Sequence, residues 1–206
     1  LSAKGHEIEA VCLDTPDSPW LPQMPFKTHA TGPVLSAYRY SPRYVPWLRK
    51  HAGNYDCVIV HGIWLYPSVG VWLALRNSGT PYFVYSHGML DPVFRSLFPL
   101  KHVAKSLLWK TVENRVVRDA RAIFFTCQEE QRLAHKSFKP FHAREAIVPY
   151  CVGEPPGDAK NQRELFLNRW PELKSKRILL FLSRIHPKKG CDALIQAFAR
   201  LASRDP

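Results

Sequence analysis

Short apolar runs alternate with amphipathic stretches along most of the chain. Each apolar run has the length of one β-strand. Between the runs, apolar residues stand three and four positions apart, which is the spacing of an amphipathic helix. The pattern predicts strands at 7–13, 34–40, 56–60, 82–85, 122–126, 146–148 and 176–183, and helices at 42–51, 68–77, 102–118, 129–137 and 190–204.

Regular alternation of strand and helix indicates an α/β protein with a Rossmann-like, doubly wound parallel sheet. The helix at 102–118 is the longest of the predicted helices. We expect it to face the sheet through five apolar positions, namely Val103, Leu107, Leu108, Val112 and Val116. The polar, proline-flanked stretch 158–171 is expected to connect two domains.

Both ends of the chain look incomplete. Gly5 resembles the C-cap of a helix whose beginning is missing. At the other end, the single strand-helix unit 176–206 cannot bury both faces of a parallel strand. We therefore interpret the chain as truncated at both ends, with a domain at 1–152, a linker at 153–175 and the first βα unit of a second domain at 176–206.

Composition is that of an ordinary globular protein, with 46% hydrophobic and 22% charged residues. No apolar run reaches the roughly 20 residues needed to span a membrane. The five cysteines form no CxxC pair, and several stand in or beside apolar runs, which favours reduced cysteines in a cytoplasmic protein over a disulfide framework or a metal site.

The net charge of +12 would suit nucleic acid, an anionic lipid surface or a phosphorylated substrate. The sequence has no long Lys/Arg tract and no basic, aromatic-rich RNA signature, so we expect no nucleic-acid partner. Five cations in or next to the helix at 102–118 could instead face anionic headgroups at the inner side of the cell membrane, or simply form a solvated helix face: Lys101, Lys105, Lys110, Arg115 and Arg118.

Two histidines follow neighbouring strands directly. His61 comes after the strand at 56–60, and His87 comes after the strand at 82–85 and Ser86. Open parallel sheets bind ligands beyond the carboxyl ends of their strands, so these positions predict imidazoles in one crevice. Gly62 and Gly88 follow them and would let a ligand or another backbone segment approach closely. Each histidine could equally cap a helix or fill a turn.

A third candidate site follows the strand at 176–183. Arg184 comes after this strand, Lys188 and Lys189 lie in a short loop, and a helix begins near Gly190. A guanidinium, an ammonium and a helix N-terminus together favour binding of a diphosphate. The alternative is that these are exposed loop charges.

These segments resemble the family-4 glycosyltransferases of the GT-B fold. Members often carry HG(I/L)W after one strand and HGMLDP after the next, and the chain has VHGIW at 60–64 and HGMLDP at 87–92. The segment LFLSRIHPKKG at 180–190 is similar to the opening of the family's second domain, where a strand ends in Gly-Arg and a Lys-Gly pair begins the helix.

The resemblance implies transfer of a sugar from a nucleotide diphosphate sugar to a saccharide or lipid-linked acceptor hydroxyl, with retention, in polysaccharide or glycolipid synthesis. It implies no essential metal and no cofactor besides this co-substrate. His87 would be the catalytic-site residue facing the donor sugar, and Arg184 and Lys189 would bind the donor diphosphate. His61, Gly62 and Gly88 would be acceptor-side or structural residues.

The chain departs from the family pattern at two places. Ser183 stands where the family usually has Gly, and the segment 150–153 replaces the common Pro-Asn-Gly-Val turn. A non-catalytic GT-B protein and another GT-B-like enzyme, such as a sugar-nucleotide epimerase, are therefore the alternatives. The family's first glycine-rich loop and its second-domain acidic motif are absent, so the isolated chain is expected to be inactive.

Overall fold

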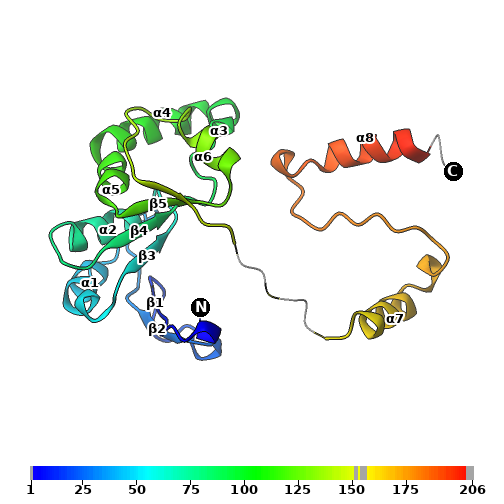
Figure 1. Cartoon of the computed structure of the whole chain (residues 1–206), viewed down its shortest axis with the longest axis horizontal. Coiled ribbons are helices and arrows are strands. Elements are labelled where there is room, and N and C mark those ends of the chain that lie inside the picture. Colours follow the sequence, from blue (N-terminus) through cyan, green and yellow to red (C-terminus); the bar gives the residue numbers. More distant parts are fainter. Residues whose placement is uncertain (1, 151–152, 154–156, 203–206) are drawn as a thin grey trace. The chain divides into compact units, whose positions relative to one another are not determined.

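A computed structural model describes residues 2–150, 153 and 157–202 of the chain. The chain divides into two compact units, residues 1–151 and residues 152–206. Each unit is described by itself (Figure 1).

The first unit is an α/β structure with two parallel sheets. Strand β1 (Glu9–Cys12) pairs with β2 (Lys27–Ala30) in a two-stranded sheet. The second sheet has the order β3-β4-β5-β6, built from β3 (Val58–His61), β4 (Tyr82–Tyr85), β5 (Ala122–Phe125) and β6 (Glu145–Ile147). Because every pairing is parallel, the carboxyl ends of these four strands lie along one edge.

One helix precedes β3, and the others connect the strands of the larger sheet. They are α1 (Tyr44–His51), α2 (Tyr66–Leu75), α3 (Val93–Leu97), α4 (Pro99–Leu108), α5 (Asn114–Asp119) and α6 (Gln128–Ala134). Short 3₁₀ turns lie at Ser2–Lys4, Leu21–Gln23 and Ala52–Asn54. Helix α2 packs closely on α1 at Gly70. A Cβ at this position would lie 2.7 Å from the Tyr44 ring. Only glycine allows this approach at that position.

The core lies between the larger sheet and its helices. Val84 of β4, Ile123 and Phe125 of β5 and Val116 of α5 have no exposed surface. Trp109 is almost fully buried, and its indole N–H donates to the Pro140 carbonyl over 2.8 Å. The tryptophan therefore buries its ring without leaving an unpaired polar group.

A partly exposed cluster of polar and charged side chains ties the smaller sheet to the chain before β3. The Glu9 carboxylate accepts from Lys27 Nζ at 3.0 Å, contacts His29 Nε2 at 2.7 Å and accepts a short hydrogen bond from the Tyr55 hydroxyl. The hydrogen bond from Tyr55, followed by those from His29 and Lys27, lowers the pKa of Glu9 to about 2.

The sequence prediction of a strand at 34–40 is wrong. This segment is a turn, closed by a hydrogen bond from the Leu35 N–H to the Tyr40 carbonyl at 2.8 Å. The pairing partner of β1 is instead the earlier segment Lys27–Ala30. The Tyr38 carbonyl accepts from the Tyr66 N–H, so it serves the start of α2 and not a sheet ladder.

The predicted helix at 102–118 is three consecutive segments. Helix α4 leads into a π-helical turn at Trp109–Glu113, and α5 continues from that turn. Val116 is buried as expected, and Leu108 and Val112 are partly buried against the core. Val103 and Leu107 were expected to face the sheet, but they are 68% and 66% exposed. Trp109 and Glu113 are buried instead, at helical spacing from His102 and Lys105, whose rings and ammonium contact Phe138 and Trp64 on the inward side.

The second unit has helices α7 (Ala159–Arg169) and α8 (Cys191–Ala202), with 3₁₀ turns at Pro171–Leu173 and Pro187–Lys189. The stretch expected to be a connection thus contains a helix, begun by Asp158, whose carboxylate accepts from the Lys160 and Asn161 N–H groups. The predicted strand at 176–183 is not formed, and Leu182 is 88% exposed. A strand needs a hydrogen-bonded neighbour, and no described residue of 153–202 supplies one.

Candidate functional site

The four strands of the larger sheet each bring a polar side chain to their carboxyl edge. His61 is the last residue of β3, and His87 follows β4 after Ser86. Thr126 follows β5, and Tyr150 lies beyond the end of β6. This edge is where open parallel sheets bind their ligands, so these residues define the candidate site.

A continuous chain of hydrogen bonds joins three of these side chains. His61 Nδ1 lies 2.9 Å from His87 Nε2, and His87 Nδ1 makes a short hydrogen bond with the Tyr150 hydroxyl. The three rings also stack almost parallel, with Tyr85 beside them. The His61–His87 ring centroids are 5.1 Å apart and the His87–Tyr150 centroids 5.6 Å. Both ring nitrogens of His87 are therefore engaged, which fixes the orientation of its imidazole.

Burial lowers the pKa of both histidines below the ordinary value. For His61 the nearby His87 adds to the effect of burial, whereas for His87 the negative charge of Glu130 partly opposes it. Both rings are thus neutral near neutral pH. A neutral imidazole has one donor and one acceptor nitrogen, so each ring can pass a hydrogen bond from one neighbour to the next.

Glu130 of α6 holds the loops that follow β4 and β5. One of its carboxylate oxygens accepts from the Ser86 hydroxyl at 2.5 Å and the Gly88 N–H at 2.6 Å. The other accepts from the N–H of Thr126 at 2.7 Å and from its hydroxyl at 2.6 Å. Burial would raise the pKa of Glu130, but these hydrogen bonds outweigh it and the pKa is lowered, so the group is a carboxylate.

This clamp bears on the backbone that carries His87. His87 has a φ of 51° and Gly88 a φ of 72°, so both lie in the left-handed region, which is unfavourable for histidine. The hydrogen bonds from Ser86 and Gly88 to Glu130 flank His87 on both sides. They hold the strained residue in place, as strained backbone at functional sites requires.

Glu113 performs a similar task for the loop after β3. Its side chain is fully buried, and one of its oxygens accepts from the Trp64 N–H at 2.9 Å and the Ser68 hydroxyl at 3.2 Å. Burial raises the pKa of Glu113 to about 7, although the hydrogen bonds from Trp64 and Ser68 pull it in the opposite direction. A titratable group therefore lies beneath the loop that begins with His61 and Gly62.

The first unit carries an open cavity of about 300 Å³ at the candidate site. His87, Thr126, Glu130 and Tyr150 line it, together with Gly88, Asp91 and Leu133. Its size is at the lower end for a small-molecule pocket. The polar groups of three strand ends thus meet in one hollow.

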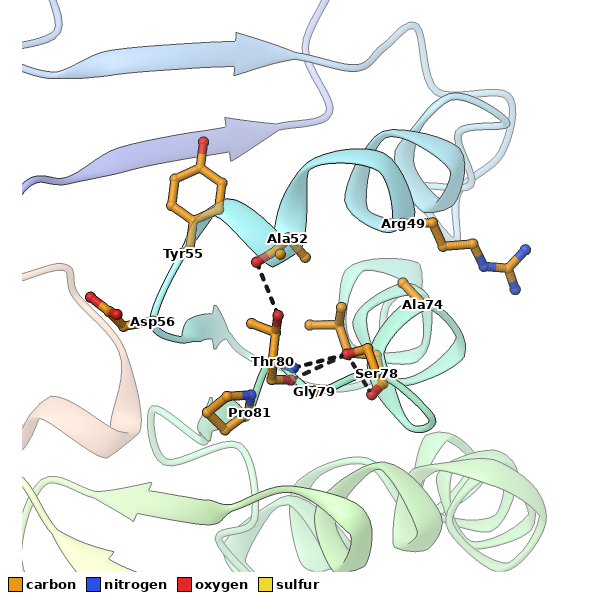
Figure 2. A pocket seen from close by; sticks show the side chains of 11 residues that line it. Arg49, Ala52, Tyr55, Asp56, Ala74, Ser78, Gly79, Thr80 and Pro81 are labelled. Atoms are coloured by element: carbon orange, nitrogen blue, oxygen red, sulfur yellow. Dashed lines mark hydrogen bonds between the residues drawn. The ribbon is translucent and has the colours of Figure 1, made fainter.

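A larger open hollow, of about 550 Å³, lies at the other end of the strands. Asp56 precedes β3 and Pro81 precedes β4, and both line this hollow (Figure 2). The hydroxyls of Ser78 and Thr80 donate hydrogen bonds to backbone carbonyls there. Thr80, for example, donates to the Ala52 carbonyl over 3.1 Å. These contacts brace the turn before β4. The hollow lies at the opposite end of the strands from the histidine site.

The structure brings together part of the predicted site. His61 and His87 are in contact, and Gly62 and Gly88 lie in their loops, both with positive φ. Gly62 also donates its N–H to the Tyr85 carbonyl at 2.8 Å, which joins the two strand ends. Arg184 and Lys189 belong to the second unit, where both are exposed, and Lys189 ends the 3₁₀ turn before α8. Their predicted role in binding the diphosphate stays a prediction.

Sequence reasoning missed Tyr150, Thr126, Glu130 and Glu113. Tyr150 and Thr126 carry a signal like that of the histidines, because Tyr150 follows the predicted strand at 146–148 and Thr126 ends the one at 122–126. Glu130 stands in the first turn of a helix after a strand, a position from which a carboxylate reaches free N–H groups. Glu113 is the one acidic residue of the predicted helix at 102–118 and stands among its apolar positions. An acid in such a position is typical of a buried carboxyl group with a hydrogen-bond partner.

The described part of the chain contains no group of three or more His, Cys, Asp or Glu side chains placed to hold a metal ion. Cys12, Cys57, Cys127 and Cys191 are free thiols. Among the described residues, no helix has both the length and the apolar character that a membrane crossing needs.

The parallel α/β fold and the polar strand ends define a Rossmann-like domain of the kind that glycosyltransferases use. Residues 1–151 match the family described as "Glycosyl transferase 4-like domain", and the chain belongs to this family. The candidate site lies within the matched residues. A comparison with curated proteins found no match.

Proposed function

We propose that the protein transfers a sugar from a nucleotide diphosphate sugar to an acceptor hydroxyl, with retention of the anomeric configuration. The observation that carries the proposal is the hydrogen-bonded chain from His61 through His87 to Tyr150 at the ligand-binding edge. It lies within a glycosyltransferase domain, and His87 and Tyr150 line a hollow together with the Glu130 carboxylate, which anchors the surrounding loops.

In this reaction the acceptor oxygen bonds to the anomeric carbon while the bond from that carbon to the β-phosphate oxygen breaks. The nucleoside diphosphate leaves with the bonding electron pair and takes up the proton of the acceptor hydroxyl. The enzyme's task is to hold both partners and to stabilise the charge that develops on the leaving diphosphate.

His87 is the residue that contacts the donor sugar in this proposal. Its Nε2 stays on His61, and a sugar hydroxyl replaces the Tyr150 hydroxyl at Nδ1. Tyr150 suits this exchange because it is 56% exposed, whereas His61 stands at the end of β3 and is fixed by the sheet. Gly62 and Gly88 shape the loops on the acceptor side.

Arg184 and Lys189 bind the donor diphosphate and neutralise it as it leaves. Both are exposed, and Lys189 directly precedes Gly190, whose carbonyl accepts from the Leu194 N–H at 3.0 Å as α8 begins. A fork-shaped guanidinium and an ammonium beside a helix N-terminus suit two phosphate groups. No metal or other cofactor takes part, and the enzyme works in the cytoplasm on a saccharide or lipid-linked acceptor.

Calorimetric titration of the full-length protein with UDP, GDP and ADP tests the donor half of the proposal. We expect one of them to bind, and the double variant Arg184→Ala/Lys189→Ala to bind it at least about 100-fold more weakly, because two charge-assisted contacts are lost. The matched control, Arg169→Ala/Lys174→Ala, removes two exposed cations of the same unit and should leave binding unchanged.

The acceptor half is tested by transfer from the corresponding nucleotide sugar. Turnover that preserves the anomeric configuration, read by proton NMR of the product, would support the proposal. Equal binding by the double variant would remove Arg184 and Lys189 from the donor site. Donor binding without transfer to any saccharide or lipid-linked acceptor would favour a non-catalytic member of the family.

A further inference from the structure

Helices α3 and α4 follow one another in the first unit (Figure 1). Several of their apolar side chains are exposed. Every residue from 95 to 101 is exposed. The most exposed large apolar side chains of these two helices are Leu100 at 86%, Val103 at 68% and Leu107 at 66%, which lie on one side of α4 at helical spacing. Leu97 and Phe98, at the junction of the two helices, continue this face. We name these five residues the α3–α4 surface.

Packing on the opposite side of α4 fixes which residues face outward. The His102 ring stacks on Phe138 with centroids 4.9 Å apart, and the Lys105 ammonium lies 4.9 Å from the centre of the Trp64 ring. Leu108 packs against the core. Because these contacts use the inward side of the helix, the α3–α4 surface cannot be buried by turning α4 about its axis.

Several cations stand in the segment that forms the apolar surface. Between residues 92 and 112 the chain has Arg95, Lys101, Lys105 and Lys110 and no Asp or Glu. Lys101 follows Leu100 and is exposed, and exposed Lys110 stands one turn after Leu107. Of the cations that the sequence suggested for membrane contact, Lys105 is partly buried against aromatic rings and Arg118 is paired with Asp119 at 2.8 Å. The available positive charge therefore lies next to the apolar residues.

We propose that the α3–α4 surface docks on an anionic phospholipid bilayer, with Leu100, Val103 and Leu107 in the interface and Lys101 and Lys110 at the headgroups. Apolar insertion combined with lysine attraction is how interfacial helices bind anionic membranes. A second copy of the chain is disfavoured, because it would bring like charges together on a protein with a net charge of +12. A nucleic acid would leave the apolar side chains without a partner.

Membrane docking would place the candidate site beside the lipid surface. Helix α3 begins at Val93, directly after the segment 87–92 that carries His87. If the proposed sugar transfer holds, the acceptor is a hydroxyl of a lipid-linked molecule in that membrane. The docking itself does not depend on the transfer, so the two can be tested separately.

Cosedimentation of the full-length protein with vesicles tests the docking. We expect binding to vesicles of phosphatidylcholine with phosphatidylglycerol and little binding to phosphatidylcholine alone. Binding should weaken at least about 10-fold when salt is raised from about 0.1 to about 0.5 M, because headgroup attraction is screened. Leu100→Asp/Leu107→Asp should lower binding at least about 10-fold at low salt, and so should Lys101→Glu/Lys110→Glu.

The matched control is Leu165→Asp/Leu201→Asp. Leu165 and Leu201 are each 63% exposed, on α7 and α8, so the control makes the same chemical change at similar exposure elsewhere. It should bind vesicles as the unchanged protein does. Circular dichroism and nucleoside diphosphate binding check that each variant is folded, and the lysine variant decides the question if the leucine variant is not.

Three outcomes would overturn the docking. They are binding that ignores lipid charge, binding by both α3–α4 variants that is as tight as that of the unchanged protein, and a self-association that Leu100→Asp/Leu107→Asp abolishes while vesicle binding is absent. α3–α4 variants that lose vesicle binding but still bind the nucleoside diphosphate would support the docking and would not contradict the proposed transfer. A full-length protein that binds vesicles as expected but binds no nucleoside diphosphate would contradict the proposed donor site and support the docking.

Discussion

His61 ends β3, His87 lies two residues after the neighbouring strand β4, and the two share one hydrogen bond of 2.9 Å between His61 Nδ1 and His87 Nε2. One of these nitrogens must carry the hydrogen and the other must accept it, so the tautomers of the two rings are coupled. If the Tyr150 hydroxyl donates to His87, then His87 donates to His61, and the hydrogen on His61 is on Nε2. Reversing every bond makes His61 Nε2 an acceptor. His61 Nε2 can therefore present either a hydrogen-bond donor or an acceptor to a ligand while both rings stay neutral.

The first prediction concerns His87. Replacing it with alanine removes the residue that contacts the donor sugar but leaves the proposed diphosphate site intact. We expect the transfer rate of His87→Ala to fall by roughly 100-fold or more, with nucleoside diphosphate binding unchanged. The control is His142→Ala, which removes an exposed histidine outside the site and should have full activity. A His87→Ala enzyme with normal turnover would show that His87 is only structural.

Tyr150 gives a prediction with the opposite sign. Its hydroxyl occupies Nδ1 of His87, the position assigned to a sugar hydroxyl. Tyr150→Phe leaves the ring stack in place and removes this competitor, so the nucleotide sugar should bind about 2- to 10-fold more tightly, as expected for one neutral hydrogen bond. Binding of the nucleoside diphosphate alone should not change.

The measurement is the ratio of the two dissociation constants, obtained by calorimetry for the wild type and for Tyr150→Phe. Tyr40→Phe, at another partly exposed tyrosine, serves as the control. Weaker sugar binding by Tyr150→Phe would mean that the hydroxyl orients His87 for the substrate and is not displaced by it.

The sequence predicts the larger sheet well and the candidate site in part. Its strands are short, local and strongly apolar, as in Tyr82–Tyr85, and the rule about strand ends places both histidines correctly. The same rule reaches Tyr150 only when β6 is known to be in the same parallel sheet. The Glu130 clamp depends on two loops that meet in space, and no local pattern records this.

Two errors have a common physical cause, since pairing and packing are not local. Helix α4 has apolar residues on two sides, and periodicity does not tell which side the sheet takes. Trp109, directly after α4, is buried in the core, whereas Val103 and Leu107 lie on the exposed side of the helix. The run at 176–183 has the composition of a strand, but a strand also needs a neighbour to pair with.

Gly62 gives a prediction about stability. Its φ is +89°, and a Cβ there would lie 3.2 Å from the Met89 Cε atom. We expect Gly62→Ala to lower the free energy of unfolding by about 1–2 kcal/mol, chiefly through backbone strain. Gly53→Ala is the control, because a Cβ at Gly53 meets nothing within 4 Å and its φ is not in the left-handed region. Equal losses in urea unfolding would show that strain at Gly62 is unimportant.

The last prediction concerns the buried Glu113. Its folded-state pKa of about 7 lies above the ordinary value of 4.5, so the folded protein binds more protons between these two pH values. The free energy of unfolding should therefore fall as pH rises from about 4.5 through about 7, and level off above that range. Glu113→Gln can still accept from the Trp64 N–H and the Ser68 hydroxyl, but it cannot ionise.

Glu113→Gln should therefore lose this part of the pH dependence. At pH 8 its free energy of unfolding should be at least that of the wild type, and higher by up to roughly 1–3 kcal/mol. Urea unfolding of both proteins at several pH values measures the difference. A variant that is less stable than the wild type at pH 8 would mean that the ionised carboxylate stabilises the Trp64–Ser68 loop. The loop after β3 would then be held by charge and not by a neutral hydrogen-bond acceptor.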